Sequence, residues 1–333
     1  MSPESPSVTE PLVSVIVIGR NEGERLTRCL QSVRAMDFPR DRLEVIYVDS
    51  HSTDDSVARA RAQGVHTVHL GDGPPTAARG RNAGSRVAAG TFLFFLDGDT
   101  LVAPQFLSHA LAYLASHPEV AVYCGHRREL YPQQSIYTRV FDLDWCERAG
   151  ESDFCGGDAV IRTSVFQEVG GFRGDVICSE DAELCTRVRA AGYKIWHADE
   201  LMTEHDMAIT SFTAYWRRCY RGGHGYAEVA DRSRGMLFKR ESIKNHIQAG
   251  AYSLIPLALV CVFGWRGVYA AFLGAALIVV FSAWRNRWRN ASFITTIFYA
   301  VHVHFCQLPI WLGQLTYLRG RRRHIVRPII EYK

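Results

Sequence analysis

The stretch FLFFLDGDT, residues 92–100, sets an uninterrupted apolar run directly before two carboxylates. The run from Phe92 to Leu96 has no polar break, which is typical of a strand that is buried on both faces. Asp97 and Asp99 follow one residue apart, so their side chains lie on the same side of the pleat. Hard divalent cations prefer such oxygen ligands, although an isolated Asp-Gly turn with solvated side chains is also common.

Before this strand, the chain alternates between short apolar runs and segments with helical character. Three further strands are predicted at 12–19, 43–50 and 65–70, with helices at 20–36, 53–64 and 76–90. This βαβαβαβ order predicts an α/β fold with a mostly parallel sheet covered by helices. Ligands bind such sheets at the carboxyl ends of the strands. Asp49 also ends a strand, so we expect it at the same edge as Asp97 and Asp99.

The next part of the chain is less regular. Residues 152–172 have the pattern of a strand, a short helix and a glycine turn. In 179–198, Ser179 is the expected N-cap of a helix whose first turn contains Glu180 and Asp181, and a strand follows. Acidic first turns are common, so this acidic pair alone is typical of ordinary helix capping.

Composition excludes several classes of protein. The 333 residues are enough for one large domain or two ordinary ones, and a net charge of +4 gives no reason to expect a nucleic-acid partner. The nine cysteines are scattered with no C-x-x-C pair, which argues against a zinc site and a disulfide scaffold. Residues 1–11 show no signal-peptide pattern and are expected to be a short flexible lead.

The C-terminal part is strongly apolar. Two runs near 247–263 and 268–284 are slightly shorter than the roughly 20 residues of a spanning helix, but with their flanks they fit a tight hairpin. A third segment, 291–318, is longer and contains polar residues. Arginine clusters flank these segments, at Arg285, Arg287 and Arg289 and at Arg319, Arg321, Arg322 and Arg323.

Three spans would place these clusters on opposite sides of the membrane, which the positive-inside tendency disfavours. We therefore predict two spanning helices and a third amphipathic segment at the cytosolic interface. Three true spans are the alternative.

Five blocks of this sequence together resemble the inverting family 2 glycosyltransferases of GT-A fold. They occur in the expected order and cover about residues 12–200. The blocks are VSVIVIGRNEGERLTRCLQSV (13–33), EVIYVDSHSTDDS (44–56), ARGRNAGSRVAAGTFLFFLDGD (78–99), GGDAVIRTSVFQEVGGF (156–172) and SEDAELCTRVRAAGYKI (179–195). The resemblance implies a Rossmann-like GT-A catalytic domain over 12–240, followed by a membrane region over 246–333.

The resemblance also implies roles at the donor site. Asp49 would hydrogen-bond the nucleotide base or ribose, and Glu22 would line the same pocket. Asp97 would contact the ribose or the outer metal shell. Asp99 would ligate a divalent metal, Mn²⁺ or Mg²⁺, that bridges the two phosphates. His205 would be a late residue that contacts the metal or phosphate.

On the acceptor side, the resemblance makes Asp181 the general base. The dipole at a helix N-terminus favours an ionised carboxylate, whereas neighbouring Glu180 would oppose ionisation. Asp158, in CGGDA, is expected to face the acceptor or sugar, with a plain turn aspartate as the equal alternative.

Basic residues supply the remaining candidates. Arg81 and Asn82 are the expected donor contacts on the helix at 76–90, with Arg79 either competing or simply exposed. Arg218 and Arg221 lie beside a glycine-rich stretch, which we interpret as a loop that closes over the diphosphate. A basic segment next to the membrane is the alternative.

The expected function is metal-dependent transfer of one sugar, with inversion, from a nucleotide-sugar donor to a lipid-linked glycan or polysaccharide-precursor acceptor. The catalytic domain is expected on the cytosolic side of the inner membrane, in contact with its lipids. The Gln-x-x-Arg-Trp motif of processive polysaccharide synthases does not occur in YWRRC (215–219), which favours single transfer. A nucleotidyltransferase is one alternative, but the first strand is not followed by the glycine-rich loop that it needs. A non-catalytic membrane scaffold is the other alternative.

Overall fold

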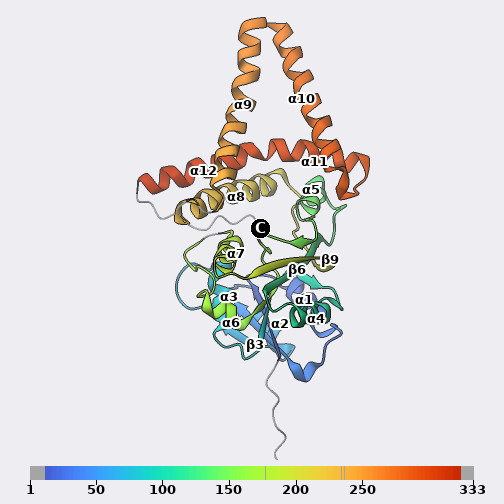
Figure 1. Cartoon of the computed structure of the whole chain (residues 1–333), viewed down its shortest axis with the longest axis vertical. Helices are drawn as coiled ribbons and strands as arrows, with labels where there is room; N and C mark the ends of the chain where they lie inside the picture. The colour runs from blue at the N-terminus through green and yellow to red at the C-terminus, as the bar shows by residue number, and fades with distance from the viewer. Residues whose placement is uncertain (1–11, 177, 234, 236, 324–333) are drawn as a thin grey trace, which may run out of the picture. The chain divides into compact units, whose positions relative to one another are not determined.

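The computed structural model describes residues 12–176, 178–233, 235 and 237–323. The predicted lead, 1–11, lies outside these residues. The chain divides into two compact units (Figure 1). The sheet unit combines the chain up to Leu130 with Glu147–Met207, and the helical unit combines Tyr131–Cys146 with the chain from Ala208 onward. The catalytic boundary near 240 stays a prediction.

Four parallel strands form one half of a nine-stranded sheet, at the positions where the sequence predicts them. They are β1 (Val13–Gly19), β2 (Leu43–Asp49), β3 (His66–His69) and β4 (Phe92–Asp97). β1 is central, with β2 on one side and β4 on the other, and β3 pairs with β2. The apolar residues of β1 and β4 are buried, as expected for strands covered on both faces. The predicted α/β fold is confirmed.

The other half of the sheet is mixed. Its strands are β5 (Thr100–Val102), β6 (Val120–Glu129), β7 (Gly150–Glu151), β8 (Ala159–Arg162) and β9 (Lys194–His205). The order is β3-β2-β1-β4-β8-β6-β9-β5, and β7 pairs with β9. β5 runs antiparallel to β9, and Thr100 is directly opposite His205. This pairing places the end of β9 beside the turn that follows β4.

Helices cover this sheet. They are α1 (Glu24–Arg34), α2 (Ser56–Ala62), α3 (Ala77–Ser85), α4 (Phe106–Ser116), α6 (Thr163–Glu168) and α7 (Glu180–Ala190), with a short 3₁₀ turn at Arg40–Arg42. α3 lies close to β1, because a Cβ on Gly84 would be only 2.4 Å from Ile16 Cγ2.

The start of α7 lacks the capping hydrogen bond that the sequence predicts. Ser179 is at the predicted N-cap position, but its side chain makes no capping hydrogen bond. Its φ of 62° is left-handed, whereas capping serines have extended backbone. The predicted capping role of Ser179 is therefore wrong, although the helix begins where the sequence predicts.

The helical unit contains the apolar segments. Its helices are α5 (Ile136–Asp144), α8 (Phe212–Arg232), α9 (Lys239–Phe263), α10 (Trp265–Asn286), α11 (Phe293–Phe305) and α12 (Gln307–Arg322), with a 3₁₀ turn at Arg287–Arg289. α9 and α10 form a hairpin that turns at Gly264, and α11 and α12 run across its base beside α8 (Figure 1). We use "base" for the hairpin end formed by the start of α9 and the end of α10.

Three helical segments among the described residues are long and apolar enough to cross a membrane. They are Lys239–Phe263, Trp265–Arg289 and Phe293–Arg322. The third consists of α11 and α12, with a break at Cys306. A third of its most apolar window is buried by other parts of the protein (33%), compared with 6% and 11% for the other two. This segment therefore packs on protein more than the hairpin does.

The glycine-rich stretch near residue 222 is helical, so our interpretation of it as a loop is wrong. It lies inside α8, a helix of 21 residues. A Cβ on Gly223 would be 2.0 Å from the Ile310 carbonyl oxygen, and one on Gly313 would be 2.1 Å from that of Tyr220. These glycines let the backbones of α8 and α12 touch, in the way that small residues do at close helix crossings.

This crossing gives a test with adjacent residues. Gly223→Ala is expected to destabilise the protein by about 1–3 kcal/mol, because its Cβ overlaps backbone atoms that no side-chain rotation can move. At Gly222 a Cβ would meet nothing within 4 Å, so Gly222→Ala should be neutral or stabilising by up to about 1 kcal/mol. Thermal unfolding of both variants in detergent measures the difference. Equal stabilities would contradict the close crossing.

Candidate active site

The site lies at the carboxyl edge of the parallel strands. In the strand register, Asp49 is opposite Gly19 of β1, and Asp97 is opposite Ile18 on the other side of β1. The two carboxylates therefore flank the end of the central strand, at the edge where the sequence places them. Asp49 is buried and accepts hydrogen bonds from the Tyr47 hydroxyl, at 3.1 Å, and from a backbone N–H.

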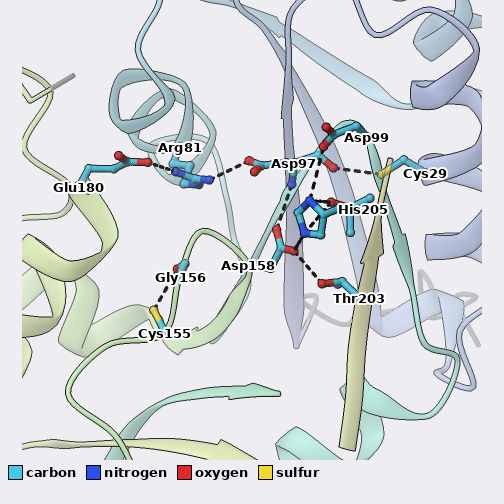
Figure 2. Close-up of polar contacts among 11 residues, drawn as sticks. Cys29, Arg81, Asp97, Asp99, Cys155, Gly156, Asp158, Glu180, Thr203 and His205 are labelled. Carbon is cyan, nitrogen blue, oxygen red and sulfur yellow. Dashed lines mark hydrogen bonds and ion pairs between the residues drawn. The ribbon is translucent and has the colours of Figure 1, made fainter. Parts of the chain in front are cut away.

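Asp97, Asp99 and His205 form a cluster at this edge (Figure 2). One ligand atom from each residue lies within 4.8 Å of the others, and Asp99 and His205 are buried. The pairing of β5 with β9 brings them together across more than a hundred residues of sequence. Two carboxylates and an imidazole form a donor set that fits a divalent cation such as Mn²⁺.

Asp158 holds the imidazole of His205 in place. Its Oδ2 atom lies 2.6 Å from His205 Nε2 and accepts a hydrogen bond from the Thr203 hydroxyl at 2.8 Å. Its Oδ1 atom accepts the backbone N–H of Asp97 at 3.2 Å. The sequence predicts Asp158 to face the acceptor or sugar, but the side chain is fully buried and both oxygens are engaged. It supports the cluster instead.

The electrostatics of this pair follow from burial and charge. Burial alone would lower the pKa of His205, but the Asp158 and Asp99 carboxylates raise it to about 10, so a cation would bind Nδ1 in competition with its proton. Burial would raise the pKa of Asp158, but His205 holds it below its usual value. With Nε2 held by Asp158, His205 Nδ1 lies 3.7 Å from Asp99 Oδ1. A carboxylate that orients a histidine in this way is typical of metal sites.

The Asp158 contact predicts an effect on metal affinity. Asp158→Asn is expected to weaken Mn²⁺ binding about 10- to 100-fold, because an amide orients the imidazole less firmly than a carboxylate. Calorimetric titration of the full chain with Mn²⁺ measures it. Asp199→Asn is the control, since Asp199 is also paired with a histidine, His126, but is highly exposed. Unchanged affinity in Asp158→Asn would contradict this role.

Arg81 bridges two acidic residues from different elements. One guanidinium nitrogen lies 2.8 Å from Asp97 Oδ1, and another lies 2.6 Å from Glu180 Oε1. The Arg81 side chain is only 2% exposed. Burial would lower its pKa, but the two carboxylates raise it above its usual value, so the residue is cationic. Arg81 therefore ties α3 to the end of β4 and to the start of α7.

Asn82 has a structural task in this arrangement. Its side-chain amide donates to the Phe172 carbonyl at 2.7 Å and accepts the Phe172 backbone N–H at 2.9 Å. Both functions of the amide are thus used to fix the glycine turn that follows α6. The donor contact that the sequence predicts for Asn82 would have to use the second N–H or the second lone pair of this amide.

Glu22 lies against the turn between the two aspartates. A Cβ on Gly98 would be 3.0 Å from Glu22 Cγ and 3.2 Å from the Ile18 carbonyl oxygen. A larger residue at position 98 would crowd both atoms, so glycine favours this close approach of Glu22. Glu22 also forms an ion pair with Arg25 at 2.8 Å. Glu22 therefore lies at the carboxyl edge of the sheet, as the sequence predicts.

Asp181 is the second residue of α7 and is half-buried. Its neighbour Glu180 is engaged by Arg81, and burial raises the pKa of Glu180 against the opposing effect of Arg81. Within the described ranges, Asp181 makes no side-chain hydrogen bond or ion pair. Of the two acidic residues, Asp181 is thus the one whose carboxylate is available for proton transfer.

The sequence predicts Arg218 and Arg221 as candidates to contact the diphosphate. Arg218 is in the helical unit, where its guanidinium lies 5.0 Å from the Phe141 ring centre and 5.8 Å from that of Trp145. Arg221 is on the same helix, α8.

Sequence reasoning missed Thr203, although its spacing of two from His205 places both side chains on one face of a strand.

The sequence and the fold both match known proteins. Residues 14–170 match the profile described as glycosyl transferase family 2. Glycosyltransferase AglE of Haloferax volcanii is 27% identical over 66% of this chain and 75% of its own length. O-antigen chain rhamnosyltransferase RfbN of Salmonella typhimurium is 24% identical over 84% of this chain and 97% of its own length.

Among solved structures, the mannosyltransferase PcManGT from Pyrobaculum calidifontis, in complex with GDP-Man and Mn²⁺, shares the fold. Its TM-score is 0.59 at 20% identity, and the match covers 94% of this chain and 89% of that one. TarS 1–349 of S. aureus in complex with UDP-GlcNAc has a TM-score of 0.50 at 16% identity, over 94% and 92% of the two chains.

Proposed function

We propose that the chain is a member of glycosyl transferase family 2 and that it transfers one sugar, with inversion, from a nucleotide-diphosphate sugar to a lipid-linked or polysaccharide-precursor acceptor. The cluster of Asp97, Asp99 and His205 carries this proposal. It lies at the strand edge where α/β sheets bind ligands. The names of similar proteins include O-antigen chain rhamnosyltransferase, which supports a glycan acceptor.

The donor site is proposed around the end of β1. Asp49 and Glu22 contact the nucleoside, since both lie at this edge. Arg81 holds Asp97 at 2.8 Å and so fixes one wall of the site. The structural neighbours crystallised with GDP-Man and UDP-GlcNAc support a nucleotide-sugar donor.

A divalent cation would be held by Asp99 and His205, with Asp97 as the third ligand. When bound, such an ion stabilises negative charge on the leaving diphosphate as a Lewis acid. The mixed carboxylate and imidazole donors favour Mn²⁺ over Mg²⁺, because Mg²⁺ is bound mainly by oxygen. Asp158 orients His205 for this role through its bond to Nε2.

Asp181 is the proposed general base. It removes the proton from the acceptor hydroxyl as that oxygen attacks the anomeric carbon, and the bond to the diphosphate breaks. Attack from the face opposite the leaving group inverts the anomeric configuration.

The candidate spanning helices indicate membrane association. We propose that α9 and α10 span the inner membrane while α11 and α12 lie at its cytosolic interface. Exposed cations gather at the base of the hairpin, at Lys239, Arg240, Lys244, Arg285 and Arg287. Only Arg266 lies next to the hairpin turn among the described residues. This asymmetry supports a cytosolic base. Accessibility labelling of a cysteine added at the C-terminus tests it, and external labelling would overturn the two-span arrangement.

Two measurements test the proposed reaction. Calorimetry with UDP and with GDP, each with and without Mn²⁺, should show metal-dependent binding of one of them. Binding of neither would favour a non-catalytic scaffold. A screen of nucleotide sugars with NMR of the product should show an inverted anomeric centre. Retention of configuration, or transfer of a nucleotidyl group, would overturn the proposed mechanism.

A further inference from the structure

The helical unit contains an apolar cavity between its membrane helices. The cavity has a volume of about 500 Å³ and is walled by α9, α10, α11 and the start of α12. Its lining includes Ala249, Pro256, Ala271, Gly274, Ile278 and His304. Pockets for small-molecule ligands have volumes of about 300–1,000 Å³, so this cavity is large enough to hold part of a ligand.

The cavity exists because small side chains on α10 are not used for helix packing. Ala270, Ala271, Gly274 and Ala275 all line it. Faces of this kind usually let two membrane helices approach closely. Here, a Cβ on Gly274 would meet nothing within 4 Å, whereas one on Gly267 near the hairpin turn would be 2.0 Å from the Leu259 carbonyl oxygen. The hairpin is therefore tight at its turn and open along this face.

One wall of the cavity carries a polar group. The Tyr252 hydroxyl lies 2.6 Å from His304 Nδ1, and both residues line the cavity. His304 Nε2 is buried and has no hydrogen-bond partner within the part of the chain that the structure describes. Most of the remaining lining is apolar, so the cavity suits the hydrocarbon part of a ligand rather than its polar part.

Charge determines which end of a ligand would lie where. The exposed cations at the base of the hairpin would attract a phosphate, whereas Arg266 is the only cation near the turn in the part of the chain that the structure describes. An amphiphile with an anionic head and a long hydrocarbon chain matches both features. Its head would lie near the base, and its chain would lie between the helices.

We propose that this cavity binds the hydrocarbon chain of the lipid-linked acceptor, with the phosphate of that lipid directed toward the cationic base of the hairpin. The inference rests on the proposed function, because it assigns a site to the acceptor of that reaction. It adds a specificity determinant, since the enzyme would then distinguish acceptors by their chains as well as by their sugars.

Photo-crosslinking tests the site without requiring catalysis. The probe is a polyprenyl phosphate with a diazirine at the far end of its chain, added to the purified full chain in detergent. We expect labelled peptides from the cavity walls of α9, α10, α11 or the start of α12, with labelling reduced by unlabelled polyprenyl phosphate and not by phosphatidylglycerol. Labelling elsewhere, or equal competition by phosphatidylglycerol, would overturn the proposal, because the occupant would then be bulk lipid.

A matched pair of variants tests the consequence for the reaction. Gly274→Leu fills the cavity, and Gly250→Leu makes the same change on α9 at a position outside the lining, also with nothing within 4 Å. Gly274→Leu should raise the KM for a polyprenyl-linked acceptor roughly tenfold. This change corresponds to about two methylene groups of the acceptor chain that are no longer buried. The KM for a short-chain soluble acceptor should stay the same, and Gly250→Leu should change neither.

The outcomes separate the two claims. If the wild-type protein glycosylates lipid acceptors but Gly274→Leu and Gly250→Leu give the same KM, the cavity does not bind the chain. If the probe labels the cavity but no nucleotide sugar is consumed, the proposed function fails while the binding site stands. Loss of labelling in Gly274→Leu, together with retained labelling in Gly250→Leu, supports the proposal independently of turnover.

Discussion

Asp181→Asn is expected to lower kcat about 10²- to 10⁴-fold, the range for loss of a general base, while nucleotide affinity stays unchanged. Asparagine has nearly the shape of aspartate but cannot accept the proton of the acceptor hydroxyl. The residue is half-buried and, among the described residues, has no ion pair or side-chain hydrogen bond that the change would break. Steady-state kinetics and calorimetry with the nucleotide measure the two effects.

Asp175→Asn is the control for this variant, because Asp175 is an exposed carboxylate in the loop before α7, paired with Arg173 at 3.2 Å. It should keep its full rate. Near-normal turnover by Asp181→Asn would assign the base to another residue. Weakened nucleotide binding with an unchanged kcat would place Asp181 at the donor.

Arg81→Met is expected to have the largest effect on stability, about 3–5 kcal/mol of the free energy of unfolding. Methionine leaves the Asp97 and Glu180 carboxylates without the cation that now lies 2.8 and 2.6 Å from them. Burial already raises the pKa of both carboxyl groups, with Arg81 as the opposing influence. Removing the cation raises both further and favours their neutral forms.

The sign of the pH dependence follows. The two carboxyl groups of the variant take up protons more readily in the folded state than in the unfolded state, so the variant loses stability as pH rises. The deficit relative to wild type should be smaller at about pH 5 than at about pH 8. Denaturant unfolding at both pH values measures it, with Arg86→Met, at an exposed position, as control. A pH-independent deficit would contradict this account.

Sequence reasoning succeeded where the signal is local. The apolar runs of β1, β2 and β4 predict buried parallel strands. Because Asp49 and Asp97 end two of these strands, their position at the carboxyl edge of the sheet is also predicted. The break between α9 and α10 at Gly264 also has a local cause, because GWRG interrupts two apolar runs. These features depend on neighbours in sequence, which a single chain displays directly.

Sequence reasoning could not predict the strand pairing or the helix crossings. The position of His205 beside Asp99 depends on β5 pairing with β9, and nothing local encodes that register. Asp158 is in a turn-like segment, but its role depends on contact with Thr203 and His205 from another strand. Glycine is typical of loops, so the stretch that contains Gly223 was interpreted as a loop. The structure instead explains this glycine by the close approach of Ile310, which lies far along the chain.

The central claim is that Asp97, Asp99 and His205 bind the cation on which sugar transfer from a nucleotide donor depends. The most direct test measures transfer of labelled sugar from a panel of nucleotide sugars to membrane lipid extract, with Mn²⁺ or with EDTA, by wild type and Asp99→Asn. We predict transfer from one donor by wild type with Mn²⁺, and loss of it both in EDTA and in Asp99→Asn. Full transfer in EDTA, or by Asp99→Asn, would contradict the claim.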